Sequence, residues 1–313
     1  MITSQAYISI KNKQLNIQSG DNNIHVPVDD IACVVLSNPQ ITITQSVLTS
    51  CAQNNVVLIN CDDKHTPNGI YHSYLTHYRC NYVLQQQMML TRDFKQNIWN
   101  KLLAQKIQNQ AESLAKVHLE MDIVKTLQQF AKEVAKNGDS QKYESQASRL
   151  YFRAMFGKDF IRITKLRPKL QHKNIQIHQD INAMLNFGYT IVRSLICRSI
   201  VAYGLLPILG VFHDNNQNAY NLADDFIEPY RAYIDWYVYS VFIQVEEAGL
   251  TIAIKAKIVD VLNHIVIIDN KKTTLLNSVD IMVKSYINAI NKYDYHLLKL
   301  PQLPIDIIRT NIS

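Results

Sequence analysis

The sequence lacks the features that mark membrane, secreted and repetitive proteins. Its five cysteines are an odd number without close pairing, which favours reduced thiols over a disulfide framework. The most apolar stretch, residues 195–212, is interrupted by Arg198 and contains Gly204, Pro207 and Gly210. It predicts a buried helix and a loop rather than a membrane span. No signal peptide, internal repeat or low-complexity segment is recognisable. We therefore expect a soluble, cytoplasmic protein.

What remains is an ordinary globular composition with a slight excess of positive charge. Of 313 residues, 47% are hydrophobic and 19% are charged, so the chain can form one large domain or two modest ones with a substantial core. Lysine and arginine number 32 against 26 aspartates and glutamates, which gives a formal net charge of +6. That excess permits a polyanionic partner without requiring one.

The spacing of apolar residues divides the chain in two. Up to about residue 75 they alternate with polar ones or form short apolar runs, as in strands, and the segment 66–69 has turn chemistry. Beyond about residue 84 the spacing is helical, including a helix over 143–156 and one over 222–245 that Pro229 must delay or kink. We predict an α+β fold: a small N-terminal β-domain over 1–80 and a larger α-helical catalytic domain over 81–313.

Three side chains in distinct settings are the candidate catalytic and metal-binding residues. Glu144 lies in the expected first turn of its helix, His213 follows an apolar segment and a glycine, and Glu228 closes an acidic cluster with Asp224 and Asp225. Two carboxylates and an imidazole form a ligand set for a hard or borderline divalent cation. Each also has a plain structural explanation, since helix N-termini favour acids and a lone histidine is more often structural.

A basic stretch over residues 162–173 contains no acidic residue and lies between the Glu144 helix and the His213 segment. Phosphates of DNA are held through such cations, and some of the 17 tyrosines could add stacking contacts. A solvated charged loop is the simpler explanation of the stretch itself. The candidate DNA-binding residues are Arg149, Arg153, Arg162, Lys165, Arg167, Lys169, Lys173 and Arg231.

Two further metal patterns are weaker. One group resembles a zinc cluster but lacks the paired spacing of zinc ligands. The dipeptide His213–Asp214 suggests a metal phosphohydrolase of the His-Asp type, but no further ligands are clearly placed. The zinc-like group comprises Cys61, His65, His72, His77 and Cys80.

At these same residues the chain resembles a known family. NCDDKHTPNGIYHSYLTHYR, the Glu144 helix with FGKDFIRIT, INAMLNFGYTIVRS, and YGLLPILGVFHDNNQNAYNLADDFIEPYR together resemble the type II branch of the CRISPR-associated adaptation integrases, the Cas-one family. By position, the family's metal ligands fall on Glu144, His213 and Glu228, with Asp225 as an auxiliary acid. Glutamate at the third place is typical of the type II branch.

The sequence departs from the family's pattern at several positions. Ser145 and Ser148 replace the glycine and alanine common after the first ligand, and Asp214 stands where a basic residue is frequent. The basic segment 166–173 is also longer than usual. None of these departures removes a ligand, but the long basic segment leaves the path of DNA open.

The resemblance implies an activity and a set of partners. The activity is insertion of short double-stranded DNA fragments into the CRISPR repeat array, by attack of a DNA 3′-hydroxyl on a phosphodiester, with Mg²⁺ or Mn²⁺. The implied partners are a second copy of the chain, the small ferredoxin-like adaptation subunit (Cas-two), and the type II effector nuclease. A stand-alone metal-dependent nuclease and a non-catalytic DNA-binding scaffold remain as alternatives.

Overall fold

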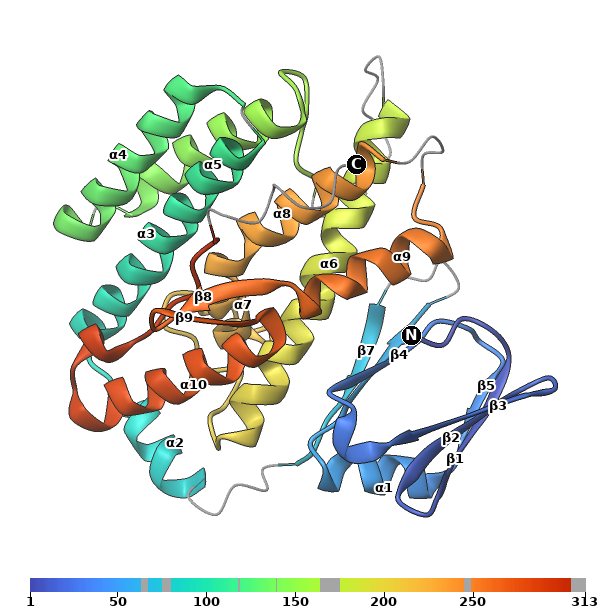
Figure 1. Ribbon diagram of the computed structural model, residues 1–313. Coiled ribbons are helices and arrows are strands. Elements are labelled where there is room, and N and C mark those ends of the chain that lie inside the picture. The colour runs from blue at the N-terminus through green and yellow to red at the C-terminus, as the bar shows by residue number, and fades with distance from the viewer. Residues whose placement is uncertain are drawn as a thin grey trace.

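The computed structural model shows a strand-rich N-terminal region beside a larger helical region (Figure 1). It describes residues 1–62, 67–74, 80–117, 119–138, 140–163, 175–244 and 249–304. The predicted α+β fold, with strands first and helices after, is confirmed. In the described ranges, no helix is both long and apolar enough to cross a lipid bilayer.

Two small sheets form the N-terminal region. The first has the order β3-β2-β1-β5, with β1 to β3 antiparallel and β5 parallel to β1. The second has the order β4-β6-β7, with β4 parallel and β7 antiparallel to β6. The elements are β1 (Ala6–Lys11), β2 (Gln14–Ser19), β3 (Asn22–Pro27), η1 (Val28–Asp30), β4 (Cys33–Leu36), β5 (Ile41–Ile43), α1 (Gln45–Gln53), β6 (Val57–Cys61) and β7 (Pro67–Tyr71).

The turn predicted at 66–69 is wrong for its described part. Pro67, Asn68 and Gly69 belong to β7, where Gly69 pairs with Asn60 of β6. A Cβ at Gly69 would lie 2.2 Å from the side-chain oxygen of Asn60. Glycine is therefore required at this position because the Asn60 side chain lies too close for a Cβ, and not because the chain turns. Pro67 is tolerated because it is the first residue of the strand.

The second sheet connects two hydrophobic cores. Its residues Val34 and Leu58 face a small core inside the N-terminal region. The opposite face, with Val35, Val57 and Ile59, belongs to the large core of the helical region. The sheet thus holds the strand region against the helices, and the boundary at residue 80 stays a prediction, although α2 begins at Cys80.

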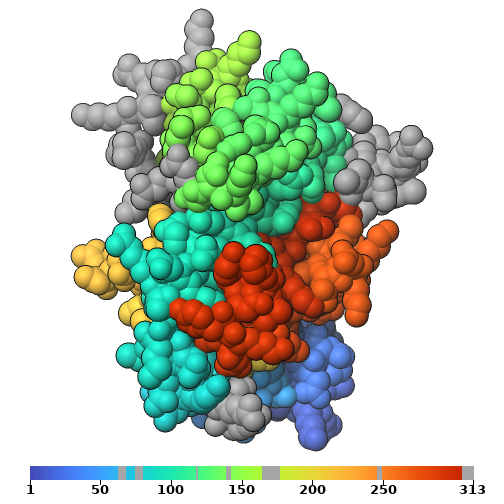
Figure 2. All heavy atoms as spheres, turned by 90° about the vertical axis from the view of Figure 1, so that its left-hand side faces the viewer, coloured from blue at the N-terminus to red at the C-terminus, as the bar shows by residue number. Residues whose placement is uncertain are grey.

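Helix α3 runs through the centre of the helical region and packs against α4, α5 and α8. Seen from the side in Figure 2, segments of the helical region cover most of the face, and blue atoms of the N-terminal region appear only at its lower edge. The elements are α2 (Cys80–Met88), α3 (Arg92–Lys116), α4 (Met121–Asn137), α5 (Ser140–Phe156), α6 (Ile175–Ala202), α7 (Asn221–Phe226), α8 (Glu228–Phe242), α9 (Ile252–Val259), η2 (Asp260–Asn263), β8 (Ile265–Ile268), β9 (Lys271–Thr274), α10 (Leu275–Lys292) and η3 (Tyr295–Leu297).

The helix predicted over 222–245 is divided into α7 and α8 at Ile227. Pro229 lies in the first turn of α8, where its missing N–H costs nothing because the first amides of a helix have no intrahelical partner. The proline thus gives a new helix start instead of a kink. The same start places Glu228 at the N-terminus of α8.

Candidate active site

The apolar face of α3 carries one lysine at the centre of the candidate site. Trp99, Leu102, Leu103 and Ile107 form the stripe that packs into the core, and Lys106 lies on the same face. The lysine is 6% exposed. A buried ammonium is costly unless it is paired, so its partners define what this part of α3 is for.

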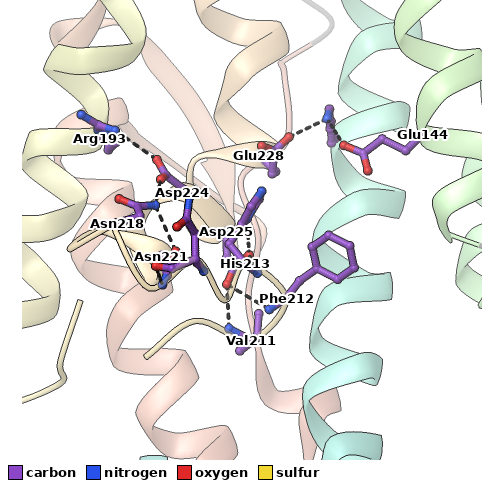
Figure 3. A network of polar contacts seen from close by, with 12 residues as sticks. Glu144, Arg193, Val211, Phe212, His213, Asn218, Asn221, Asp224, Asp225 and Glu228 are labelled. Carbon is purple, nitrogen blue, oxygen red and sulfur yellow. Dashed lines mark hydrogen bonds and ion pairs between the residues drawn. The ribbon is translucent and has the colours of Figure 1, made fainter. Parts of the chain in front are cut away.

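Lys106 joins two of the three predicted ligands. Its Nζ donates to Oε1 of Glu144 at 2.9 Å and lies 2.6 Å from Oε2 of Glu228. Glu144 comes from α5 and Glu228 from α8, and Figure 3 shows the two carboxylates pointing toward one another. Three helices thus bring two distant acids to a single cation.

Glu144 lies deeper in its helix than the sequence predicted. Helix α5 begins at Ser140, so Glu144 is in the second turn and not the first. Stabilisation by the helix N-terminus falls off within the first turn, and that explanation of Glu144 loses its basis. Its side chain is 31% exposed and reaches toward α3.

Glu228 is the buried member of the pair. Its side chain is 5% exposed, Oε1 accepts from Nε of Arg231 at 2.8 Å, and Oε2 faces Lys106. The Oε2 contact is a charge contact without hydrogen-bond alignment. Burial opposes ionisation, but the charges of Arg231 and Lys106 lower the pKa of Glu228 to about 2. For Lys106, burial works against its charge, and Glu228 and Glu144 raise its pKa overall.

His213 is positioned by a buried carboxylate. Asp225 of α7 is fully buried and accepts from Nδ1 of His213 at 2.7 Å. It also accepts from the backbone N–H groups of Val211, Phe212 and His213 at 2.6, 3.2 and 3.1 Å. Figure 3 shows these four donors gathered around Asp225. The hydrogen bond to Asp225, stronger than the opposing effect of burial, raises the pKa of His213.

The loop before His213 leaves no room for a side chain at Gly210. A Cβ there would lie 2.2 Å from the backbone oxygen of His213 and 2.8 Å from Oδ2 of Asp225. Trp99 closes the other side, with its ring stacked on Phe212 at 4.1 Å and edge-on to His213 at 5.7 Å. Backbone, carboxylate and indole therefore fix the imidazole together.

The two aspartates of the acidic cluster do not face the carboxylate pair. The carboxylate of Asp225 is hydrogen-bonded to the His213 loop. The carboxylate of Asp224 accepts from the side-chain amide of Asn218 at 2.7 Å and pairs with the guanidinium of Arg193 at 3.4 Å. The role of auxiliary metal ligand for Asp225 therefore gains no support from its contacts. They make it instead a carboxylate that orients the histidine.

A cleft of about 500 Å³ opens beside the carboxylate pair. Tyr189 donates to the buried carboxylate of Asp235 inside it, and the guanidinium groups of Arg162 and Arg231 lie 5.1 and 4.7 Å from the centre of the Tyr189 ring. Burial raises the pKa of Asp235 to about 6, although its hydrogen bond with Tyr189 works the other way. The lining residues are Lys106, Gln110, Glu144, Ser148, Arg149, Phe152, Arg153, Phe160, Ile161, Arg162, Tyr189, Glu228, Arg231 and Asp235.

Four of the eight candidate DNA-binding residues line this cleft: Arg149, Arg153, Arg162 and Arg231. Arg162 is held by Asn182 and Asn186 at 2.8 and 2.6 Å, so its guanidinium has a fixed direction. The other four, Lys165, Arg167, Lys169 and Lys173, lie outside the described residues, as do His65 and His77 of the zinc-like group.

The donor chemistry fits a divalent cation, although the ligands do not yet enclose one. No three carboxylate, imidazole or thiol groups in the described ranges are gathered as a metal site. Glu144 and Glu228 nevertheless already share a cation, and Glu228 lies close enough to His213 to raise its pKa. Because Asp225 binds Nδ1, His213 keeps Nε2 for coordination, the usual arrangement of a metal-binding histidine.

Sequence reasoning missed Lys106 and the hydrogen bonds by which Asp225 holds the His213 loop. A signal for Lys106 was present, because a lysine within the stripe of Leu103 and Ile107 must be buried and therefore paired. Asp225 gave no such signal, because its partners are backbone amides of a loop whose path the sequence does not specify.

The comparisons agree with the fold. The model of the family "CRISPR associated protein Cas1" matches residues 1–247. The CRISPR-associated endonuclease Cas1 of Neisseria meningitidis is 32% identical over 304 residues, spanning 97% of this chain and 95% of that protein. A solved casposase bound to integration product has a TM-score of 0.78 at 18% identity, covering 98% of this chain and 94% of that chain.

A chain of a solved Cas6-RT-Cas1–Cas2 complex has a TM-score of 0.71 at 16% identity, covering 97% of this chain and 36% of that one. At these identities the two solved structures show a shared fold. The family match and the Neisseria relative go further: this chain belongs to the Cas1 family of CRISPR-associated proteins.

Proposed function

We propose that this protein is a divalent-metal-dependent DNA integrase and endonuclease of CRISPR spacer acquisition, of the type II branch. The observation that carries the proposal is the meeting of Glu144 and Glu228 at one cation beside a cleft lined by arginines. The Neisseria relative is named an endonuclease and the casposase structure holds an integration product. Both names support the same chemistry here.

The reaction is a transesterification. The oxygen of a DNA 3′-hydroxyl gives its proton to solvent and forms a bond to a phosphorus in the repeat. The bond from that phosphorus to the 3′-oxygen of the repeat strand breaks, and the released oxygen takes a proton from solvent to become a new 3′-hydroxyl. One phosphodiester replaces another, so no nucleotide hydrolysis is required. Water in place of the hydroxyl gives strand cleavage.

Mg²⁺ or Mn²⁺, bound by Glu144, His213 and Glu228, would neutralise charge at the phosphate and lower the pKa of the attacking oxygen. Asp225 fixes the tautomer of His213 by accepting from Nδ1. The arginines of the cleft hold the flanking phosphates, because guanidinium groups donate in the planar geometry that phosphate oxygens accept.

A strand-joining assay tests the proposal. Glu144→Ala and His213→Ala should abolish insertion of a DNA fragment into a supercoiled plasmid carrying the repeat, while circular dichroism and size-exclusion profiles match the wild type. Full joining by either variant would refute the assignment of that residue.

Two further experiments separate the rival functions. A stand-alone nuclease would cut branched DNA without joining strands. A non-catalytic scaffold would show the same DNA output when a chelator removes divalent metal.

We further propose that the chain works as a homodimer, with the small ferredoxin-like subunit Cas2 and in contact with the type II effector nuclease. The complex of Cas1 with Cas2 among the solved structures supports the second partner. Light scattering of the chain alone and with Cas2 tests both stoichiometries. A monomer that inserts DNA at full rate without Cas2 would contradict this assembly.

A further inference from the structure

Lys106 occupies the position that a cation shared by Glu144 and Glu228 would take. Its Nζ lies 2.9 Å from an oxygen of Glu144 and 2.6 Å from an oxygen of Glu228. A magnesium ion binds oxygen ligands at about 2.0–2.1 Å, so it would need the same space between the two carboxylates. Two cations cannot share that gap, because both the space and the sign of charge oppose it.

Each carboxylate oxygen of Glu228 lies beside a cationic side chain. Oε1 accepts from Arg231 and Oε2 faces Lys106, and the side chain is 5% exposed. Arg231 is also held on its other side, where its guanidinium lies over the ring of Tyr189. This geometry makes Lys106 the cation that can leave with the smaller disturbance.

We propose that Lys106 is a built-in competitor of the divalent ion, bridging Glu144 and Glu228 in the metal-free state and withdrawing when metal binds. The inference rests on the proposed function for the existence of the metal centre. In the metal-free protein the ammonium keeps the two acids together until metal displaces it.

The cleft offers the displaced ammonium a new partner. Lys106 lines the cleft together with Arg149, Arg153 and Arg162, and the flexible stem of a lysine allows its charge to move while the helix stays in place. A DNA phosphate in the cleft would accept from the freed ammonium. Metal and DNA should therefore favour each other's binding through this one side chain.

The test is Mn²⁺ binding to the full chain without DNA, measured by calorimetry. Lys106→Met removes the competing charge and keeps the apolar stem, so we expect Mn²⁺ to bind at least about tenfold more tightly than to the wild type. The same variant should melt at a lower temperature in chelator and recover more on addition of Mn²⁺. The control is Lys101→Met on the same helix, whose Nζ donates to the backbone oxygens of Tyr295, His296 and Leu298. This control should lose stability with no gain in Mn²⁺ affinity.

A second variant and a measurement on the wild type cover the case in which Lys106→Met does not fold. Lys106→Gln keeps a neutral donor at the position and should also bind Mn²⁺ more tightly. In wild-type protein, the slowly exchanging ammonium signal in ¹⁵N NMR that is absent from Lys106→Gln should shift or vanish on addition of Mg²⁺.

Equal or weaker Mn²⁺ binding by these variants, or an ammonium signal unchanged by Mg²⁺, overturns the role of Lys106. If the wild type still binds Mn²⁺ and Glu228→Gln does not, the metal centre itself survives that result. If neither the wild type nor any Lys106 variant binds Mn²⁺, the proposed metal centre and this inference fail together.

Discussion

The two carboxylates and the imidazole of the site are held by different means. Glu144 and Glu228 project from helices and meet through charge at Lys106, and Glu228 also pairs with Arg231. His213 sits on a loop, and its imidazole is held by the buried carboxylate of Asp225, which also accepts from three backbone amides of that loop. Figure 3 shows both halves in one view.

Because of this difference, folding and function are coupled more closely in the loop than in the helices. On the helix side, the scaffold is formed by core packing, and the charged groups are added to it. On the loop side, the contacts that orient His213 are the same contacts that give the loop its shape. Changes on the loop side should therefore damage stability and metal binding together, and changes of exposed charges on the helix side should affect DNA binding alone.

The largest expected effect is on the loop side. Asp225→Ala leaves three backbone N–H groups without an acceptor, that of Val211 in a buried hydrogen bond and those of Phe212 and His213 in partly buried ones. Each such loss costs about 1–3 kcal/mol when the group is buried, so we expect a loss of roughly 4 kcal/mol in the free energy of unfolding. Urea denaturation measures it. Asp224→Ala is the matched control, because its carboxylate is 20% exposed and pairs with Arg193; it should cost below about 1 kcal/mol. Equal losses in the two variants would remove the distinction.

The next effect is the pH dependence of stability that Asp235 of α8 contributes on the helix side. Burial raises the pKa of Asp235 from its ordinary 3.8 to about 6, so the folded protein keeps this proton in a range where the unfolded chain has lost it. Stability from Asp235 is therefore full below pH 3.8 and is lost as pH rises through 6. The total is about 3 kcal/mol, of which about 2 kcal/mol falls between about pH 4.5 and 7.

Asp235→Asn carries no such proton and should lose that share of the pH dependence. Comparing urea denaturation of the variant and the wild type at both pH values isolates the contribution, since the other carboxylates titrate alike in the two proteins. A difference between the proteins that does not change with pH would contradict the raised pKa.

A smaller effect returns to the loop. Gly210→Ala places a methyl group 2.2 Å from the backbone oxygen of His213, and relief of such overlap by backbone shifts costs about 1–3 kcal/mol. Because the shift moves His213, Mn²⁺ affinity should fall with stability. The control is Asn216→Ala, at an exposed position a few residues further along the chain, which should change neither quantity measurably. A Gly210→Ala protein with unchanged Mn²⁺ affinity would separate loop shape from the metal centre.

The smallest effect on stability is expected at exposed arginines of the helix side. Arg149 and Arg153 are exposed on α5, so their replacement by glutamine should change the unfolding free energy by less than about 0.5 kcal/mol. DNA binding should lose salt dependence, with the slope of log K against log salt reduced by about 0.9 for each phosphate contact removed. An unchanged slope would exclude these two arginines from the DNA path.

The sequence predicted the architecture because the architecture depends on local spacing. Alternation at the strands and the stripe of Trp99, Leu102 and Leu103 on α3 are visible without knowledge of tertiary contacts. The start of α8 was also open to prediction, since Pro229 restricts where a helix can begin.

The site could be predicted only in part. Residue types and family resemblance made Glu144, His213 and Glu228 the candidates, but did not show what lies between them. Lys106 became visible only when α3, α5 and α8 were packed together, because its two partners come from other helices. The prediction of a turn at Pro67–Gly69 was wrong because of a tertiary contact as well. These residues are typical of turns, but pairing with β6 makes them part of a strand.

We propose that Glu144, His213 and Glu228 together bind one divalent ion. Mn²⁺ titration of the wild type and of the three single alanine variants, each checked for folding by circular dichroism, tests it most directly. We predict one Mn²⁺ per chain in the wild type and at least about a hundredfold weaker binding in every variant, about 2.7 kcal/mol each. A His213→Ala protein that binds Mn²⁺ as tightly as the wild type would contradict a metal site shared by the three residues.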